Sequence, residues 1–171
     1  MKKFLSVVAF SAVTLSGCTS LSPEQRATID TMTPCEKITG LLSAYDNRFE
    51  GLKRTRVNTK YMETWTAKYN LVGNDCQITA LDKDTVTYRC QDEYNEQNQA
   101  IALHQKAVGF TRECLAANNW YEQQKESAES LRTTFVLDEA TPVISIHTGK
   151  TMSRSKPWST SLEIGKPVES K

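Results

Sequence analysis

The sequence predicts an α+β domain in which two main helices pack on an antiparallel sheet and two disulfides cross-link the fold. Two long segments carry apolar residues at helical spacing, whereas six shorter segments alternate apolar and polar residues. Four cysteines follow residue 18 and form an even set. The expected order is helix, three strands, helix, three strands, in one domain over residues 33–171.

The first main helix is expected to begin at Thr33. Pro34 suits the first helical position, and Glu36 stands where a capping box places an acidic residue. Apolar residues then recur at helical spacing up to Phe49, and Gly51 is the expected stop.

The second main helix is expected over about residues 94–115, with a short polar helix from Trp120. Between and after the helices, alternating patterns predict strands, and the segment "TGKTMSRSKP" predicts a polar loop. The expected strands cover residues 61–71, 76–80, 86–90, 131–137, 143–147 and 158–164.

The stretch "CQITALDKDTVTYRC" predicts its own pairing as a hairpin. If Asp82-Lys83-Asp84 is a three-residue loop with Asp84 in the left-handed conformation, Cys76 faces Cys90. The apolar residues between them then share one face of the hairpin with the cysteines, with Leu81 as the one apolar misfit. Gln77, Thr79, Thr87 and Arg89 share the other face. A shift by one residue would destroy this segregation.

Four cysteines allow three disulfide connectivities, and the hairpin register favours Cys76–Cys90, which leaves Cys35–Cys114. A zinc site is the alternative. Against zinc, no cysteine pair has C-x-x-C spacing and the chain has only two histidines. We therefore expect two disulfides and no metal ligands or cofactor.

The amino terminus combines two lysines with an apolar run over residues 4–15, too short to span a bilayer. Leu15-Ser16-Gly17-Cys18 resembles the lipobox of bacterial lipoproteins. The resemblance implies cleavage before Cys18, attachment of a diacylglycerol to its sulfur and fatty acylation of the freed amine. Residues 1–17 would then be the signal peptide and residues 18–32 a tether. The alternative is an ordinary signal peptide with a chance cysteine.

A multi-chain lipid anchor suffices for stable membrane attachment. In lipoproteins of enteric-type bacteria, aspartate after the lipidated cysteine tends to retain the protein in the inner membrane. Thr19 stands at that position here, so the resemblance implies the outer membrane, facing the periplasm. Without Lys2 and Lys3 the chain has 19 basic and 20 acidic side chains, and so no electrostatic reason to bind nucleic acid.

No catalytic motif is present in the sequence. His104 lies at the edge of the apolar stripe of the second helix and is expected to be a boundary histidine. His147 belongs to a strand, and no Asp or Ser spacing marks a triad around it. We therefore expect a protein that is not an enzyme, with a hydrolase of unrecognised site as one alternative.

Residues 53–56 are expected to be a loop. Four basic residues between positions 53 and 60 are expected to form a compact basic patch. Its members are Lys53, Arg54, Arg56 and Lys60. We interpret the patch as a docking site for an anionic glycan, lipid head groups or an acidic partner, the alternative being a solvated loop. The expected function is an envelope lipoprotein that binds a protein or cell-wall partner. "TVTYRC" also resembles a strand of the lipoprotein-type lysozyme inhibitors, although their Ser-Gly-x-x-Tyr loop is absent. An inhibitor or immunity protein against an exported toxin or hydrolase is therefore the second hypothesis.

Overall fold

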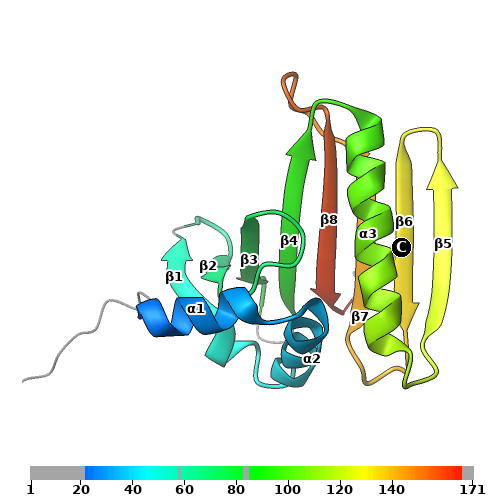
Figure 1. The fold of residues 1–171 in the computed structure, drawn as a ribbon. Coiled ribbons are helices and arrows are strands. Elements are labelled where there is room, and N and C mark those ends of the chain that lie inside the picture. The colour runs from blue at the N-terminus through cyan, green and yellow to red at the C-terminus, as the bar shows by residue number, and fades with distance from the viewer. Residues whose placement is uncertain (1–21, 58, 83–84, 167–171) are drawn as a thin grey trace, which may run out of the picture.

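A computed structural model describes residues 22–57, 59–82 and 85–166 (Figure 1). In these ranges the chain forms an α+β fold with three α-helices, one 3-10 turn and one antiparallel sheet of eight strands. The helical segments are α1 (Pro23–Thr31), α2 (Pro34–Ala44), η1 (Glu50–Leu52) and α3 (Gln97–Leu115).

The eight strands lie in the order β1-β2-β3-β4-β8-β7-β6-β5, so β4 and β8 meet at the centre and β1 and β5 are the edges. Each half of the sheet is a four-stranded meander that follows one main helix, α2 or α3. The strands are β1 (Lys53–Val57), β2 (Glu63–Ala67), β3 (Asp75–Ala80), β4 (Val86–Tyr94), β5 (Tyr121–Ser127), β6 (Ser130–Val136), β7 (Val143–Lys150) and β8 (Trp158–Gly165).

The expected order of three strands after each helix is wrong, because each helix is followed by four. The additional strands are β1, expected to be a loop, and β5, expected to be a short polar helix. Both are edge strands that pair with only one neighbour. β5 is exposed on both faces and β1 consists mainly of basic residues, so neither strand shows the apolar alternation that predicts a strand.

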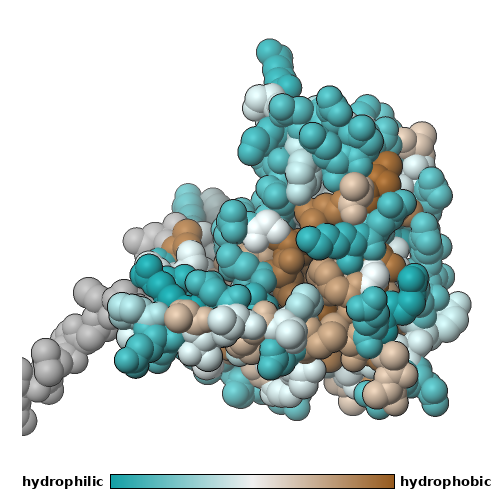
Figure 2. All heavy atoms as spheres, in the orientation of Figure 1, coloured by the Kyte–Doolittle hydropathy of each residue, from teal (hydrophilic) through white to brown (hydrophobic). Residues whose placement is uncertain are grey.

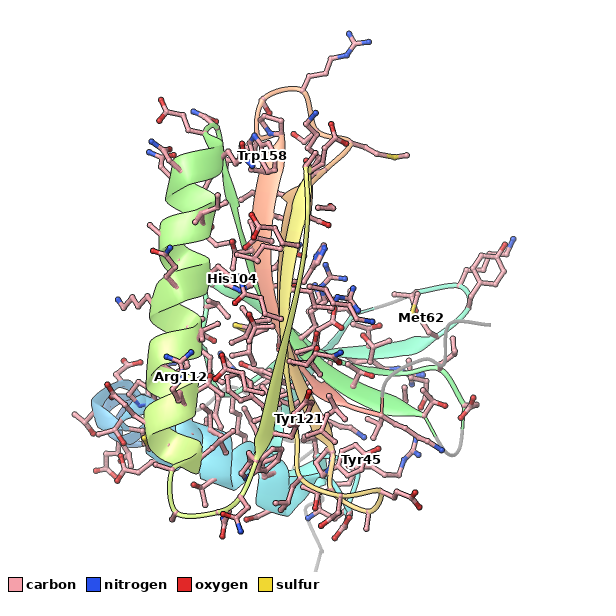
Figure 3. The ribbon with its side chains drawn as sticks, turned by 90° about the vertical axis from the view of Figure 1, so that its right-hand side faces the viewer. Tyr45, Met62, His104, Arg112, Tyr121 and Trp158 are labelled. Carbon is pink, nitrogen blue, oxygen red and sulfur yellow. A yellow bond between two sulfur atoms is a disulfide. The ribbon has the colours of Figure 1, made fainter. Side chains whose placement is uncertain are left out.

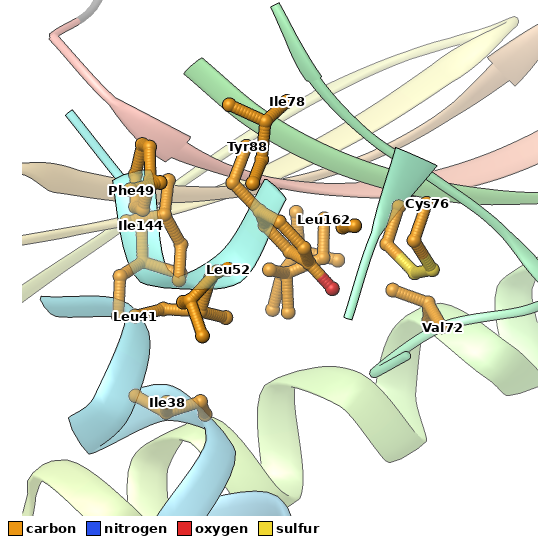
Figure 4. Packing of buried hydrophobic residues seen from close by; sticks show 14 of the residues in the cluster. Ile38, Leu41, Phe49, Leu52, Val72, Cys76, Ile78, Tyr88, Ile144 and Leu162 are labelled. Atoms are coloured by element: carbon orange, nitrogen blue, oxygen red, sulfur yellow. A yellow bond between two sulfur atoms is a disulfide. The ribbon is translucent and has the colours of Figure 1, made fainter. Parts of the chain in front are cut away.

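All three helices lie on one side of the sheet (Figure 1). α3 packs directly on β4, β7 and β8, whereas the main contacts of α2 are with α3 and η1. The apolar side chains of α2, α3 and one sheet face form a single core (Figure 4). The opposite face of the sheet has no covering layer among the described residues, and the strands of the two halves splay apart through the twist of the sheet (Figure 3).

Helix boundaries differ from the expected ones at two places. α2 ends at Ala44, and the chain then turns so that Arg48 and Phe49 adopt left-handed φ angles of 60° and 57°. This turn inserts the fully buried Phe49 into the core from outside the helix. α3 begins at Gln97 because Tyr94 is still paired in β4.

The predicted hairpin register and both predicted cysteine pairs are confirmed. Cys76 is opposite Cys90 in the β3–β4 ladder, and the two form one disulfide. Cys35 at the start of α2 and Cys114 near the end of α3 form the other, with Cα atoms 4.9 Å apart. Asp84, expected in the left-handed conformation, lies outside the described residues.

α1 begins with a capping box at Ser22 and contains no buried residue. Its surface is polar, whereas apolar surface on the same side of the molecule is concentrated beside α3 (Figure 2). None of the described helices is long and apolar enough to cross a membrane. The predicted signal peptide and Cys18 lie outside the described residues.

Candidate functional site

Three large apolar side chains are exposed together where the β1–β2 and β3–β4 connections meet. The exposed fractions are 79% for Tyr61, 44% for Met62 and 61% for Leu81. They line one groove of about 630 Å³, which we call the tip groove. Figure 3 shows Met62 on the part of the sheet that projects away from α3. The tip groove is lined by Arg48, Arg56, Thr59, Lys60, Tyr61, Met62, Glu63, Ala80, Leu81 and Asp82.

The tip groove also carries positive charge. Arg56 forms an ion pair with Glu63 at 2.8 Å, across the β1–β2 pair. The ammonium of Lys60 lies 5.2 Å from the centre of the Tyr61 ring, within the range of a cation–π contact. Arg56 and Glu63 are both more than half exposed, so a partner could exchange this pair for a new one at low energetic cost.

The four cations of the predicted basic patch do not form a single patch. Arg56 and Lys60 line the tip groove. Lys53 forms an ion pair with Glu50 and lies 4.1 Å from the Trp65 ring centre. Arg54 lines a separate cavity next to α1. The register of β1 against β2 shifts between Lys53 and Arg56, so these side chains do not follow one regular strand alternation.

A second groove, of about 440 Å³, lies on the open face of the sheet, and Thr59 and Met62 line both grooves. Asp75 orients two side chains of this groove, because the Asp75 carboxylate accepts hydrogen bonds from Gln77 at 2.9 Å and Gln91 at 3.3 Å. Arg89 and Glu163 form an ion pair at 3.3 Å across the central β4–β8 junction. The open-face groove is therefore polar and internally paired.

Part of this groove is predictable from the sequence. The predicted hairpin places Gln77 and Arg89 on its polar face, and the β3–β4 register confirms that placement. The sequence does not indicate that Glu163 is a neighbour of Arg89, because no local pattern predicts the pairing of β4 with β8. The exposed Tyr61 and Met62 were also missed, although an apolar pair beside Lys60 in a polar connection is a signal in the sequence.

His147 lies half-buried on the open face, in the strand register opposite Ser161 and Arg132. Burial lowers its pKa, and the positive charge of Arg132 lowers it further, while Glu163 opposes the shift. The imidazole is therefore neutral at neutral pH.

His104 is fully buried between α3 and the sheet rather than at a boundary. Its ring nitrogens contact the hydroxyls of Thr133 at 2.9 Å and Thr148 at 3.1 Å. Burial lowers its pKa to about 4. Because His104 is closed off from solvent and both its nitrogens are bonded, its evident role is to attach α3 to β6 and β7.

Over the described ranges, no group of three or more His, Cys, Asp or Glu side chains is arranged to hold a metal ion. The four cysteines found there are all in disulfides. The chemically distinctive surface of the described chain is therefore the pair of grooves that share Thr59 and Met62.

No protein-family model matches the chain, and no curated protein or solved structure is significantly similar to it. The fold defines the class only as an α+β domain with one antiparallel sheet and two disulfides.

Proposed function

We propose that this protein is a non-catalytic lipoprotein of the cell envelope that binds a protein or cell-wall partner through the tip groove. One observation carries the binding role. Three of the six exposed large apolar side chains among the described residues gather around this single groove, together with Arg56 and Lys60.

Tyrosine and arginine are the residue types that contribute most when an interface forms around a desolvated centre. Scattered single apolar residues need no explanation on a surface, but apolar side chains that gather around one groove are typical of an interaction site. Tyr61, Met62 and Leu81 provide the apolar centre, and Arg56 and Lys60 provide a charged rim.

A hydrogen bond and a disulfide hold the chain segments that form the tip groove. Leu81 directly follows β3, and Arg48, which also lines the groove, donates a hydrogen bond to the Asp82 carbonyl at 3.0 Å. The Cys76–Cys90 disulfide bonds β3 to β4 along the same hairpin. A preformed surface loses little conformational entropy when it binds, so this arrangement favours affinity.

The lipobox supports the location of the protein. Lipidation at Cys18 would hold the domain at a membrane surface, and Thr19 favours the outer membrane with the domain in the periplasm. The oxidising periplasm is also a compartment in which Cys35–Cys114 and Cys76–Cys90 would form and persist.

Photo-crosslinking in cells tests the binding role. A photoreactive amino acid at position 61 should capture a discrete partner. The same amino acid at position 121 is the matched control, because Tyr121 is 66% exposed on the opposite edge strand. Equal products from both positions, or none from position 61, would contradict the proposed surface.

A second function, as an inhibitor or immunity protein, is supported by the connection between β7 and β8. This projecting loop is held by hydrogen bonds from the Thr151 amide to the Pro157 carbonyl at 2.8 Å and from the Thr151 hydroxyl to the Lys156 carbonyl at 2.7 Å. It presents a fully exposed Met152. Inhibition of an exported hydrolase that Met152→Ser weakens and Tyr61→Ser leaves intact would favour this function over the first.

A further inference from the structure

Four basic side chains line a small cavity of about 220 Å³ between α1 and the main body of the domain. They come from different elements: Arg26 from α1, Lys37 from α2, Arg54 from β1 and Lys68 from the segment after β2. Asp30 is the only carboxylate among the lining residues. The cavity, which we call the α1 cavity, thus has a net charge of about +3 with one neutral polar residue, Asn70.

None of these four cations forms an ion pair with any described residue, whereas Lys53 and Arg56 on the same strand as Arg54 are both paired. Lys37 donates to the Asn70 carbonyl at 3.3 Å. The Nε atom of Arg54 is buried and has no hydrogen-bond partner among the described residues. The positive charge around the α1 cavity is thus not compensated by ion pairs with the described residues.

We propose that the α1 cavity binds the phosphate group of an anionic phospholipid. A phosphate offers several acceptor oxygens and negative charge, and it matches a guanidinium flanked by ammonium groups. The same anion would attach α1 to the domain, since α1 has no buried side chain to hold it there. Figure 1 shows α1 crossing in front of β1 and β2, over the elements that supply Arg54 and Lys68.

The choice of a lipid rather than a soluble phosphate rests on the proposed lipid anchor. Only the residues from Cys18 to Ser22 separate that anchor from α1. A fully extended chain of five residues reaches about 18 Å at most. Lipidation at Cys18 would therefore hold the α1 cavity close to the headgroups of the membrane.

The phosphate site can be tested without the anchor. The chain of residues 18–171 with Cys18→Ser keeps the whole described fold, and inorganic phosphate is the probe. Phosphate should slow amide hydrogen exchange across α1, and Arg54→Gln with Lys68→Gln should remove that protection. Lys106→Gln with Lys125→Gln is the matched control, because both lysines are exposed far from the cavity and the same charge is lost. Protection that is absent, or equally reduced in both double variants, would overturn the site.

The lipid source is tested with the same three chains and sedimented vesicles. Vesicles of phosphatidylglycerol and phosphatidylcholine should bind the Cys18→Ser chain, and vesicles of phosphatidylcholine alone should not. Because each basic residue near an anionic surface contributes about fivefold in affinity, the Arg54/Lys68 variant should bind about 25-fold more weakly. Phosphate protection without preference for anionic vesicles would overturn the lipid source. Failure of Cys18 lipidation in cells would instead contradict the proposed function and leave the phosphate result standing.

Discussion

His104 donates its Nδ1–H to the hydroxyl oxygen of Thr148, 3.1 Å away. The tautomer follows from the rest of the chain of hydrogen bonds. The Thr160 hydroxyl donates to the Ala100 carbonyl at 2.7 Å, so Thr148 must donate to Thr160 at 2.8 Å and can only accept from His104. Nε2 is then the acceptor for the Thr133 hydroxyl at 2.9 Å. A neutral imidazole satisfies the whole network, and a second proton on the ring would disrupt it.

This network predicts loss of stability at mildly acidic pH. The pKa of His104 is lowered from 6.5 to about 4. Between pH 6.5 and pH 4 the unfolded state therefore binds a proton at this residue that the folded state does not. The stability that the neutral His104 imidazole contributes is therefore complete above about pH 6.5, falls as the pH drops from 6.5 to 4, and does not change further below about pH 4. The loss should be at most about 3 kcal/mol, and urea unfolding at several pH values measures it.

The control for that prediction is His104→Gln, which cannot titrate in this window. It should be less stable at pH 7 because the network is disturbed, but its stability should vary less with pH between 6.5 and 4. His147 also has a lowered pKa and contributes a dependence of the same sign, which remains in the variant. An unchanged pH profile in His104→Gln would show that His104 is not the source.

Removal of the Cys35–Cys114 disulfide should destabilise the fold more than removal of Cys76–Cys90. The bonds close loops with sequence separations of 79 and 14 residues. The loop-entropy model gives about 4.5 kcal/mol for the longer loop and about 3 kcal/mol for the shorter one. Denaturant unfolding of the double-alanine variant of each pair measures the difference. A larger loss for the Cys76–Cys90 pair would contradict this ranking.

The central part of the fold was predictable because burial imposes a period on the sequence there. Ile78, Tyr88 and Cys90 are fully buried on one face, and one register alone keeps them together. The edge strands β1 and β5 were not predictable, since each is stabilised by pairing with one neighbour rather than by burial. The early end of α2 has a third cause: Phe49 enters the core through a left-handed turn that helical periodicity does not indicate.

The candidate site was predictable only in part for a related reason. The basic residues near Arg56 are visible in the sequence, but which of them face one another depends on the register shift in β1. Leu81 was an apolar misfit in the hairpin pattern, and the structure gives it a place in the tip groove. A residue that violates the local pattern was thus the best sequence indication of the exposed surface.

Gly73 should not tolerate a side chain. Its φ is +67°, and an added Cβ would lie 2.3 Å from the Gln91 carbonyl oxygen. Gly73→Ala should therefore cost about 2 kcal/mol or more. Gly51→Ala is the matched control because a Cβ there meets nothing within 4 Å. Thermal unfolding of both variants measures the effect, and equal melting temperatures would refute the expected clash.

Cys18→Ser should abolish lipid labelling and leave the protein unprocessed or released from the membrane, since Cys18 is the cysteine of the lipobox. Metabolic labelling with a fatty acid, followed by membrane fractionation, measures both effects. Cys35→Ser is the control, because it also replaces one cysteine by serine but should keep the lipid. Normal membrane attachment of the Cys18→Ser variant would contradict the proposed lipid anchor.

The two cationic regions of β1 should differ in their effect on partner capture. Arg56 and Lys60 line the tip groove, so replacing both by serine should weaken partner capture, and the loss should shrink as salt increases because their charges are exposed. The variant should melt close to the wild-type temperature, since exposed ion pairs contribute little to stability. Arg54→Ser is the matched control, as Arg54 lines the α1 cavity instead and should leave capture intact. If Arg54→Ser weakens capture as strongly as the double variant, the partner does not bind at the tip groove. If His104→Ala and His147→Ala each abolish a measured turnover without unfolding the domain, the protein is an enzyme after all.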